Sequence, residues 1–129
     1  MFSHVMVGSN DIDKSKTFYD AVFTATGGRA GRIDPMGRLV YVNNGGVFLV
    51  TPPIDGQPAT HGNGSTIGFA VDSPEQAVAW QEAGVAAGGT AIEDPPGVRS
   101  GLGVNLYLAY LRDPSGNKIC AMHRLPNDA

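Results

Sequence analysis

The chain lacks the features that mark secreted, membrane and nucleic-acid-binding proteins. Its single cysteine, Cys120, excludes an internal disulfide and is typical of a reducing compartment. No apolar run approaches the roughly 18 residues of a membrane span, and the first residues do not have the basic and apolar segments of a signal peptide. Acidic residues (12) outnumber basic ones (9), so the net charge is −3 and no basic stripe points to nucleic acid. We therefore expect a cytoplasmic protein with neither a membrane nor a nucleic acid as partner.

Common catalytic signatures are missing as well. The sequence holds no Ser-His-Asp arrangement, no phosphate-binding loop and no dinucleotide fingerprint. Gly84, Gly88 and Gly89 do not form a phosphate loop, because they end a predicted helix rather than begin one. Any function must therefore come from side chains that the fold brings together.

The chain does contain an internal repeat at an offset of 62 residues. The residues that recur are Val5, Val7, Phe18 and Gly27, which match Ile67, Phe69, Trp80 and Gly89. Each copy reads as a strand, a capped helix and a Gly-Gly stop. A length of 129 residues with 42% apolar residues suits one domain, 1–129. Two copies of a unit that cannot bury its apolar face alone predict a pair of modules around a shared cavity.

Both halves are predicted to have the order β-α-β-β-β, which makes the domain α+β. Module 1 covers about 1–53, a linker rich in Pro and Gly covers about 54–64, and module 2 covers about 65–125. In module 1 the expected elements are a strand over 2–8 buried on both faces, a helix over 12–26 capped by Asn10 or Asp11, a loop or irregular strand over 29–37, and strands over 39–42 and 47–50 around a four-residue turn. In module 2 they are a strand over 66–71, a helix from the capping box Ser73-Pro74-Glu75-Gln76 to about 87, a short strand over 90–93, a loop over 94–104, and strands over 106–112 and 118–122.

Two segments carry a resemblance to a known family. The segments are Phe2-Ser3-His4-Val5-Met6-Val7, followed by Asp11, Ser15, Phe18 and Tyr19, and then Tyr110-Leu111-Arg112-Asp113-Pro114-Ser115-Gly116-Asn117-Lys118-Ile119. The chain resembles the vicinal oxygen chelate superfamily, which contains glyoxalases, bleomycin resistance proteins and extradiol dioxygenases. The resemblance implies two βαβββ modules whose eight strands curl into a half-open barrel. It also implies a small-molecule ligand in the cavity and a homodimer, often with the cavity at the subunit interface.

The same resemblance implies a divalent metal held at four positions on the first and last strands of the modules. Metal-binding members carry His, His or Gln, and Glu there, whereas this chain has His4, Leu49, Thr66 and Cys120. Imidazole and thiolate can bind metal, but Leu49 has no donor atom and Thr66 offers only a neutral hydroxyl. A catalytic metal normally has about three protein ligands. We expect no cofactor, and Zn, Ni or Fe held by His4 and Cys120 is the alternative.

Each candidate residue has two interpretations. His4 is a metal ligand or a hydrogen-bonded histidine of the cavity. Cys120 is a ligand, a nucleophile activated by His4, or a small buried apolar residue. Thr66 binds a ligand or is an ordinary strand residue. Tyr110 and Arg112 share one strand face and suit an anionic or carbonyl-bearing ligand, unless that face is an outer surface.

Three other side chains are weaker candidates. Arg99 lies in the predicted loop over the cavity mouth and suits an anion. His61 lies in the linker, where it is solvated or reaches a neighbouring subunit. His123 follows the last predicted strand and is expected at the surface.

The sequence leaves several functions open, and it does not decide whether the protein is an enzyme. The favoured one is a superfamily protein that acts on or binds an unidentified small molecule, with the usual metal ligands largely lost. One alternative is a metal-dependent lyase or isomerase of the glyoxalase type that uses His4, or an enzyme related to the dioxygenases. Others are a metal-free protein that sequesters an antibiotic or another small molecule, and a metal-free enzyme that uses His4 with Cys120.

Overall fold

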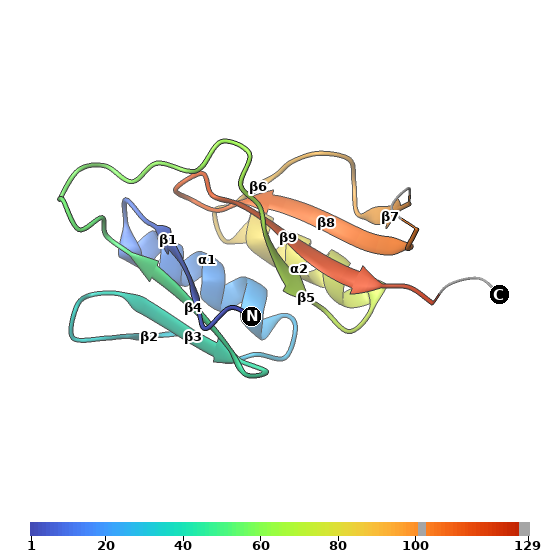
Figure 1. Cartoon of the computed structure of the whole chain (residues 1–129), viewed down its shortest axis with the longest axis horizontal. Coiled ribbons are helices and arrows are strands. Elements are labelled where there is room, and N and C mark those ends of the chain that lie inside the picture. Colours follow the sequence, from blue (N-terminus) through green and yellow to red (C-terminus); the bar gives the residue numbers. More distant parts are fainter. Residues whose placement is uncertain (101–102, 127–129) are drawn as a thin grey trace.

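The computed structural model describes residues 1–100 and 103–126, and its elements form two similar halves (Figure 1). In chain order the elements are β1 (Val5–Gly8), α1 (Ile12–Thr24), β2 (Arg32–Ile33), β3 (Leu39–Asn43), β4 (Gly46–Thr51), β5 (Ile67–Ala70), α2 (Pro74–Ala86), β6 (Thr90–Ala91), β7 (Gly97–Arg99), β8 (Leu106–Arg112) and β9 (Lys118–Arg124).

The strands form two mixed sheets. The first has the order β1-β4-β3-β2, and the second has the order β5-β9-β8-β6 with β7 also paired to β8. In each sheet the first strand of the module runs parallel to the last, β1 with β4 and β5 with β9. The α+β class and the repeated order of elements are therefore confirmed. Strand β7 is a correction, because it lies within the segment 94–104 that was predicted as a loop.

The helices begin at the predicted caps. The carboxylate of Asp11 accepts a hydrogen bond from the Lys14 backbone N–H at 3.0 Å. The hydroxyl of Ser73 accepts one from the Gln76 backbone N–H at 3.1 Å, with Pro74 in the first turn. Such side chains satisfy backbone donors that have no partner inside the helix. The local signals thus fix where both helices start.

One hydrophobic core joins the two halves. Phe18, Tyr19 and Trp80 are fully buried within it, together with residues of both sheets. Gly84 of α2 lies against both β8 and α1, since a Cβ atom added there would lie 2.3 Å from Leu111 Cδ1 and 3.1 Å from Val22 Cγ1. Glycine lowers the stability of a helix interior, but here its lack of a side chain allows this close packing. In Figure 1 both helices lie behind the sheets, so each sheet has one face toward the core and one face away from it.

We call the surface of the two sheets that points away from the helices the open face. Residues 1–4 precede β1, and Met6 is 39% exposed on this face. The prediction of a first strand over 2–8 buried on both faces is therefore wrong, because no element of the described chain covers the second face. The turn between β3 and β4 is also shorter than predicted. Only Asn44 and Gly45 separate the strands, with φ values of 50° and 80° that suit a tight hairpin. Among the described residues, no helix is both long and apolar enough to cross a membrane.

Candidate functional site

The turn between β8 and β9 ties the two modules together. The Asp113 carboxylate accepts hydrogen bonds from the Tyr19 hydroxyl at 2.6 Å and from the Asn117 side-chain amide at 2.8 Å. It also accepts hydrogen bonds from the backbone N–H groups of Ser115 and Asn117 in its own turn. The Asn117 amide donates in addition to the Gly8 carbonyl at 2.9 Å. Burial, and next the charge of Asp113, raises the pKa of Tyr19 well above its usual value, so its hydroxyl stays a donor. This turn thereby fixes β9 relative to α1 and β1.

The four positions implied for a metal do not form a donor set. Leu49 pairs with Met6 on the first sheet, whereas Cys120 pairs with Gly68 on the second. The His4 imidazole lies 2.8 Å from the Ser3 hydroxyl, and no described residue joins it to Cys120 by a hydrogen bond. Within 1–100 and 103–126, no group of three or more His, Cys, Asp or Glu side chains could hold a metal ion. The residues present therefore do not fit a divalent ion, which normally takes about three protein ligands.

Cys120 is buried in the second sheet. Only 6% of its surface is exposed, and burial raises the pKa of its thiol to about 11. Lys118 lowers that pKa and Glu93 raises it, both less strongly than burial. The side chain is therefore a neutral thiol near pH 7, which disfavours both thiolate ligation and nucleophilic attack.

A polar cluster surrounds Cys120 on the open face. Tyr110 lies opposite Cys120 in the β8–β9 register. The Lys118 ammonium lies 5.1 Å from the centre of the Tyr110 ring and forms an ion pair with Glu93. Burial raises the pKa of Tyr110. The charges of Cys120 and Glu93 raise it further, and the positive charges of Lys118 and Arg99 lower it. We call Glu93, Arg99, Tyr110, Lys118 and Cys120 the open-face cluster.

The backbone at Glu93 is unusual. Its φ of 60° lies in the left-handed region, which residues other than glycine adopt rarely. Such backbone strain is often found at binding and active sites. Sequence reasoning did not select Glu93 or Lys118. Alternation along β9 could have identified Lys118, since Lys118 and Cys120 are two residues apart and therefore lie on the same strand face.

The two other predicted ligand contacts lie in different surroundings. Arg112 shares the open face with Tyr110, as predicted, but its guanidinium donates to the Gly116 carbonyl at 2.8 Å within the turn. Thr66 precedes β5 and, with Met6 and Lys118, lines a hollow of about 620 Å³ beneath the linker. Thr66 therefore shares a hollow with Lys118 of the cluster, whereas a hydrogen bond holds Arg112 against the turn.

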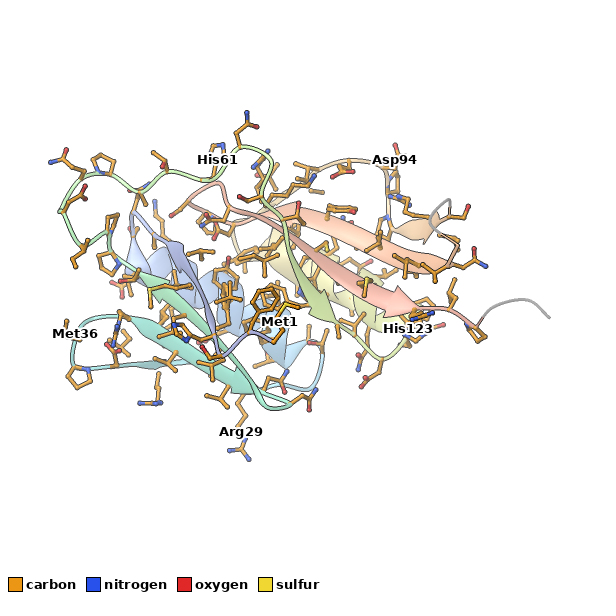
Figure 2. All side chains as sticks on the ribbon, viewed as in Figure 1. Met1, Arg29, Met36, His61, Asp94 and His123 are labelled. Atoms are coloured by element: carbon orange, nitrogen blue, oxygen red, sulfur yellow. The ribbon has the colours of Figure 1, made fainter. Side chains whose placement is uncertain are left out.

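The two histidine candidates, His61 and His123, lie toward opposite ends of the second sheet (Figure 2). His61 is exposed on the linker, where its ring lies beside Gly116. His123 lies near the end of β9, with Nδ1 3.2 Å from the Val71 carbonyl. Neither histidine belongs to the open-face cluster. Arg99 in β7 has Nη2 3.1 Å from the Pro95 carbonyl, which orients the guanidinium.

The fold and the sequence both match one family. The family model of the glyoxalase/bleomycin resistance protein/dioxygenase superfamily matches residues 1–121. The chain belongs to this superfamily. A search of curated proteins gave no match. The resemblance seen in the β8–β9 turn is thus confirmed, and that turn has a clear structural role in holding the modules together.

One solved structure supports the same assignment, and two more distant ones share the fold. A glyoxalase/bleomycin resistance protein from Albidiferax ferrireducens is 59% identical, with a TM-score of 0.92 over 96% of this chain and 99% of that chain. A glyoxalase/bleomycin resistance protein/dioxygenase family enzyme from Burkholderia phytofirmans is 21% identical, with a TM-score of 0.71 over 95% and 98% of the two chains. A fosfomycin resistance protein from Listeria monocytogenes is 14% identical, with a TM-score of 0.67 over 100% and 94%. The last two likenesses concern the fold alone.

Proposed function

We propose that this superfamily member binds a small anionic molecule with an apolar body at the open-face cluster, without a protein-held divalent ion. The observation that carries the proposal is the arrangement of Lys118 over the Tyr110 ring, with Glu93 and Arg99 close by. Two cations against one carboxylate leave a net positive charge around a neutral phenol. That charge suits an anion, and the phenol can donate a hydrogen bond to it.

The surroundings of the cluster support an apolar body for the ligand. Leu108 and Met122 pair with each other on the same face, beside Tyr110 and Cys120. The hollow lined by Thr66, Met6 and Lys118 adjoins the cluster through Lys118. Small-molecule sites commonly combine apolar walls with a few converging polar groups.

We further propose that the protein works as a homodimer in the reducing cytoplasm. The open face leaves Met6, Val42 and Met122 between 37% and 59% exposed. A second copy that covers this face would turn an exposed cluster into an enclosed site. The neutral, unpaired thiol of Cys120 is compatible with a reducing compartment.

Isothermal titration calorimetry with benzoate as the probe tests the binding proposal. We expect the Lys118→Met variant to bind benzoate at least about tenfold more weakly than the wild type, a loss of about 1.4 kcal/mol. The matched control is Lys14→Met, which removes an equal charge from the exposed side of α1. Equal affinities for the wild type and Lys118→Met, or no binding of benzoate to the wild type, would contradict the proposal.

Metal analysis of untagged protein separates the proposal from the metal-dependent alternative. We expect Zn, Ni and Fe far below one ion per chain, because only His4 among the four implied positions carries a strong donor. A stoichiometric content of any of these metals would contradict the proposal and favour a metal-dependent lyase or isomerase that uses His4.

A further inference from the structure

The edges of the two sheets face each other along a seam between β1 and β5, and one end of this seam carries a side-chain amide. In each parallel pair, only alternate residues of the first strand bond to its neighbour. Ser9 bonds to Thr51, so the backbone groups of Gly8 point away from β4 into the seam. There the Gly8 carbonyl accepts the Asn117 side-chain amide at 2.9 Å. A carboxamide from the β8–β9 turn therefore donates one hydrogen bond to the edge of β1, beside the hollow of about 620 Å³ that Gly8 and Asn117 also line.

The other end of the seam has the same construction without the amide. The repeat places Ala70 of β5 where β1 has Gly8, at an offset of 62, and it places Gly46 where the second half has Asn117, at an offset of 71. Val71 bonds to Met122 of β9, so the backbone groups of Ala70 point into the seam. Gly46 lies on the strand face of Phe48 and Val50, which is the core side. It has no side chain that could reach Ala70.

A cavity of about 310 Å³ occupies this end of the seam. Gly46 and Asn43 of the β3–β4 hairpin line it, and Gly68 and Ala70 contribute the edge of β5. Its lining includes five aromatic residues, which come from both modules: Phe23, Tyr41, Phe48, Phe69 and Trp80. The Trp80 indole N–H is buried and has no hydrogen-bond acceptor among the described residues. A cavity of this size has room for a ligand of one or two rings.

We propose that this seam cavity binds a planar aromatic carboxamide, at a site separate from the open-face cluster. The aromatic walls suit a flat ring. The amide N–H of such a ligand would give the edge of β5 the hydrogen-bond donor that the Asn117 side chain provides at the edge of β1. The ligand class follows from the residue missing at Gly46, so it does not depend on the charge at Lys118.

Benzamide is the probe, and Trp80 is the reporter because it is the only tryptophan in the chain. We expect benzamide to change the Trp80 fluorescence saturably, at a concentration at least about tenfold lower than toluene requires, since toluene lacks the amide. The variant Gly46→Asn places a side-chain amide in the cavity, and a Cβ atom there would meet only the Asn43 carbonyl at 3.4 Å. We expect it to weaken benzamide binding at least tenfold.

The matched control is Gly45→Asn, the same change one residue earlier. Gly45 does not line the cavity, and its φ of 80° is one that asparagine tolerates better than most residues. This variant and Lys118→Met should bind benzamide as the wild type does. Unchanged affinity in Gly46→Asn, or equal affinity for toluene and benzamide, would overturn the proposal.

A second measurement needs no variant. In ¹H–¹⁵N spectra of the wild type, benzamide should shift the backbone amides of Gly68 and Ala70 and the Trp80 indole signal. The absence of shifts at all three would overturn the proposal even if benzoate binds the open-face cluster. Conversely, a failure of benzoate to bind leaves these shifts as expected.

Discussion

Cys120 illustrates how one residue takes its chemistry from its surroundings. The sequence could not distinguish a ligand, a nucleophile and a small apolar residue, because all three require knowledge of burial and of nearby charge. In the structure the thiol is 6% exposed, and its charged neighbours on the open face are Lys118 and Glu93. The charge of Lys118 does not offset the cost of burying a thiolate.

The ionisation of the Cys120 thiol can be measured by its alkylation. Alkylation of the folded protein by iodoacetamide should rise with an apparent pKa near 11, because burial raises the pKa of the thiol to about 11. Since an unfolded thiol ionises near pH 8.5, the contribution of Cys120 to stability is complete below that pH and is lost as the pH rises toward about 11.

Urea unfolding at a series of pH values checks the sign of this dependence. The fall in the unfolding midpoint above about pH 8.5 should be shallower in Cys120→Ala than in the wild type. Fast alkylation of the folded wild type near neutral pH would contradict the prediction and would favour activation of Cys120 by His4.

The turn between β8 and β9 combines a conformation that its own sequence predicts with contacts that only the fold provides. Its sequence predicts a tight turn, since Pro114 and Gly116 supply the backbone conformations that such turns need. The long-range partners of Asp113 and Asn117 could not be predicted, because Tyr19 and Gly8 lie more than ninety residues away in the chain. The carboxylate therefore stabilises contacts between modules in addition to its own turn.

The Asp113→Ala variant tests this role. The change leaves the buried Tyr19 hydroxyl and one N–H of the Asn117 side-chain amide without their acceptor, so we expect a loss of about 2–4 kcal/mol in the free energy of unfolding. Urea denaturation gives the value. Asp34→Ala is the control, because Asp34 also accepts backbone and Arg38 hydrogen bonds, but only within its own turn. A loss in Asp113→Ala no larger than in Asp34→Ala would show that the turn does not hold the modules together.

In the molecule as a whole, the open face is the sheet surface that the helices leave uncovered. Its exposed apolar residues include Met6 and Met122, one from each sheet. Alternation in the sequence identified which residues share a strand face, but it could not say which face the helices cover. The prediction that the first strand is buried on both faces was wrong for this reason.

The proposed homodimer predicts how the protein sediments. The wild type should sediment as a dimer, and Met122→Lys should shift it toward the monomer, because a charge on the open face would have to be buried in the interface. Val85→Lys is the control, since Val85 is 49% exposed on α2. A monomeric wild type, or a dimer that Met122→Lys leaves unchanged, would contradict the proposed interface.

The sequence by itself determined the two repeated modules, the helix caps at Asp11 and Ser73, and the superfamily, because these depend on periodicity and on contacts a few residues apart. Tertiary structure alone decided that Gly84 is a contact point between helices, that Lys118 and Glu93 meet beside Tyr110, and that Cys120 stays neutral. It also decided that the Asn117 side chain donates to the edge of β1 at one end of the seam, whereas Gly46, which has no side chain, lies at the corresponding place beside the edge of β5. Each of these depends on the distance and burial of groups far apart in the chain, which local patterns do not encode.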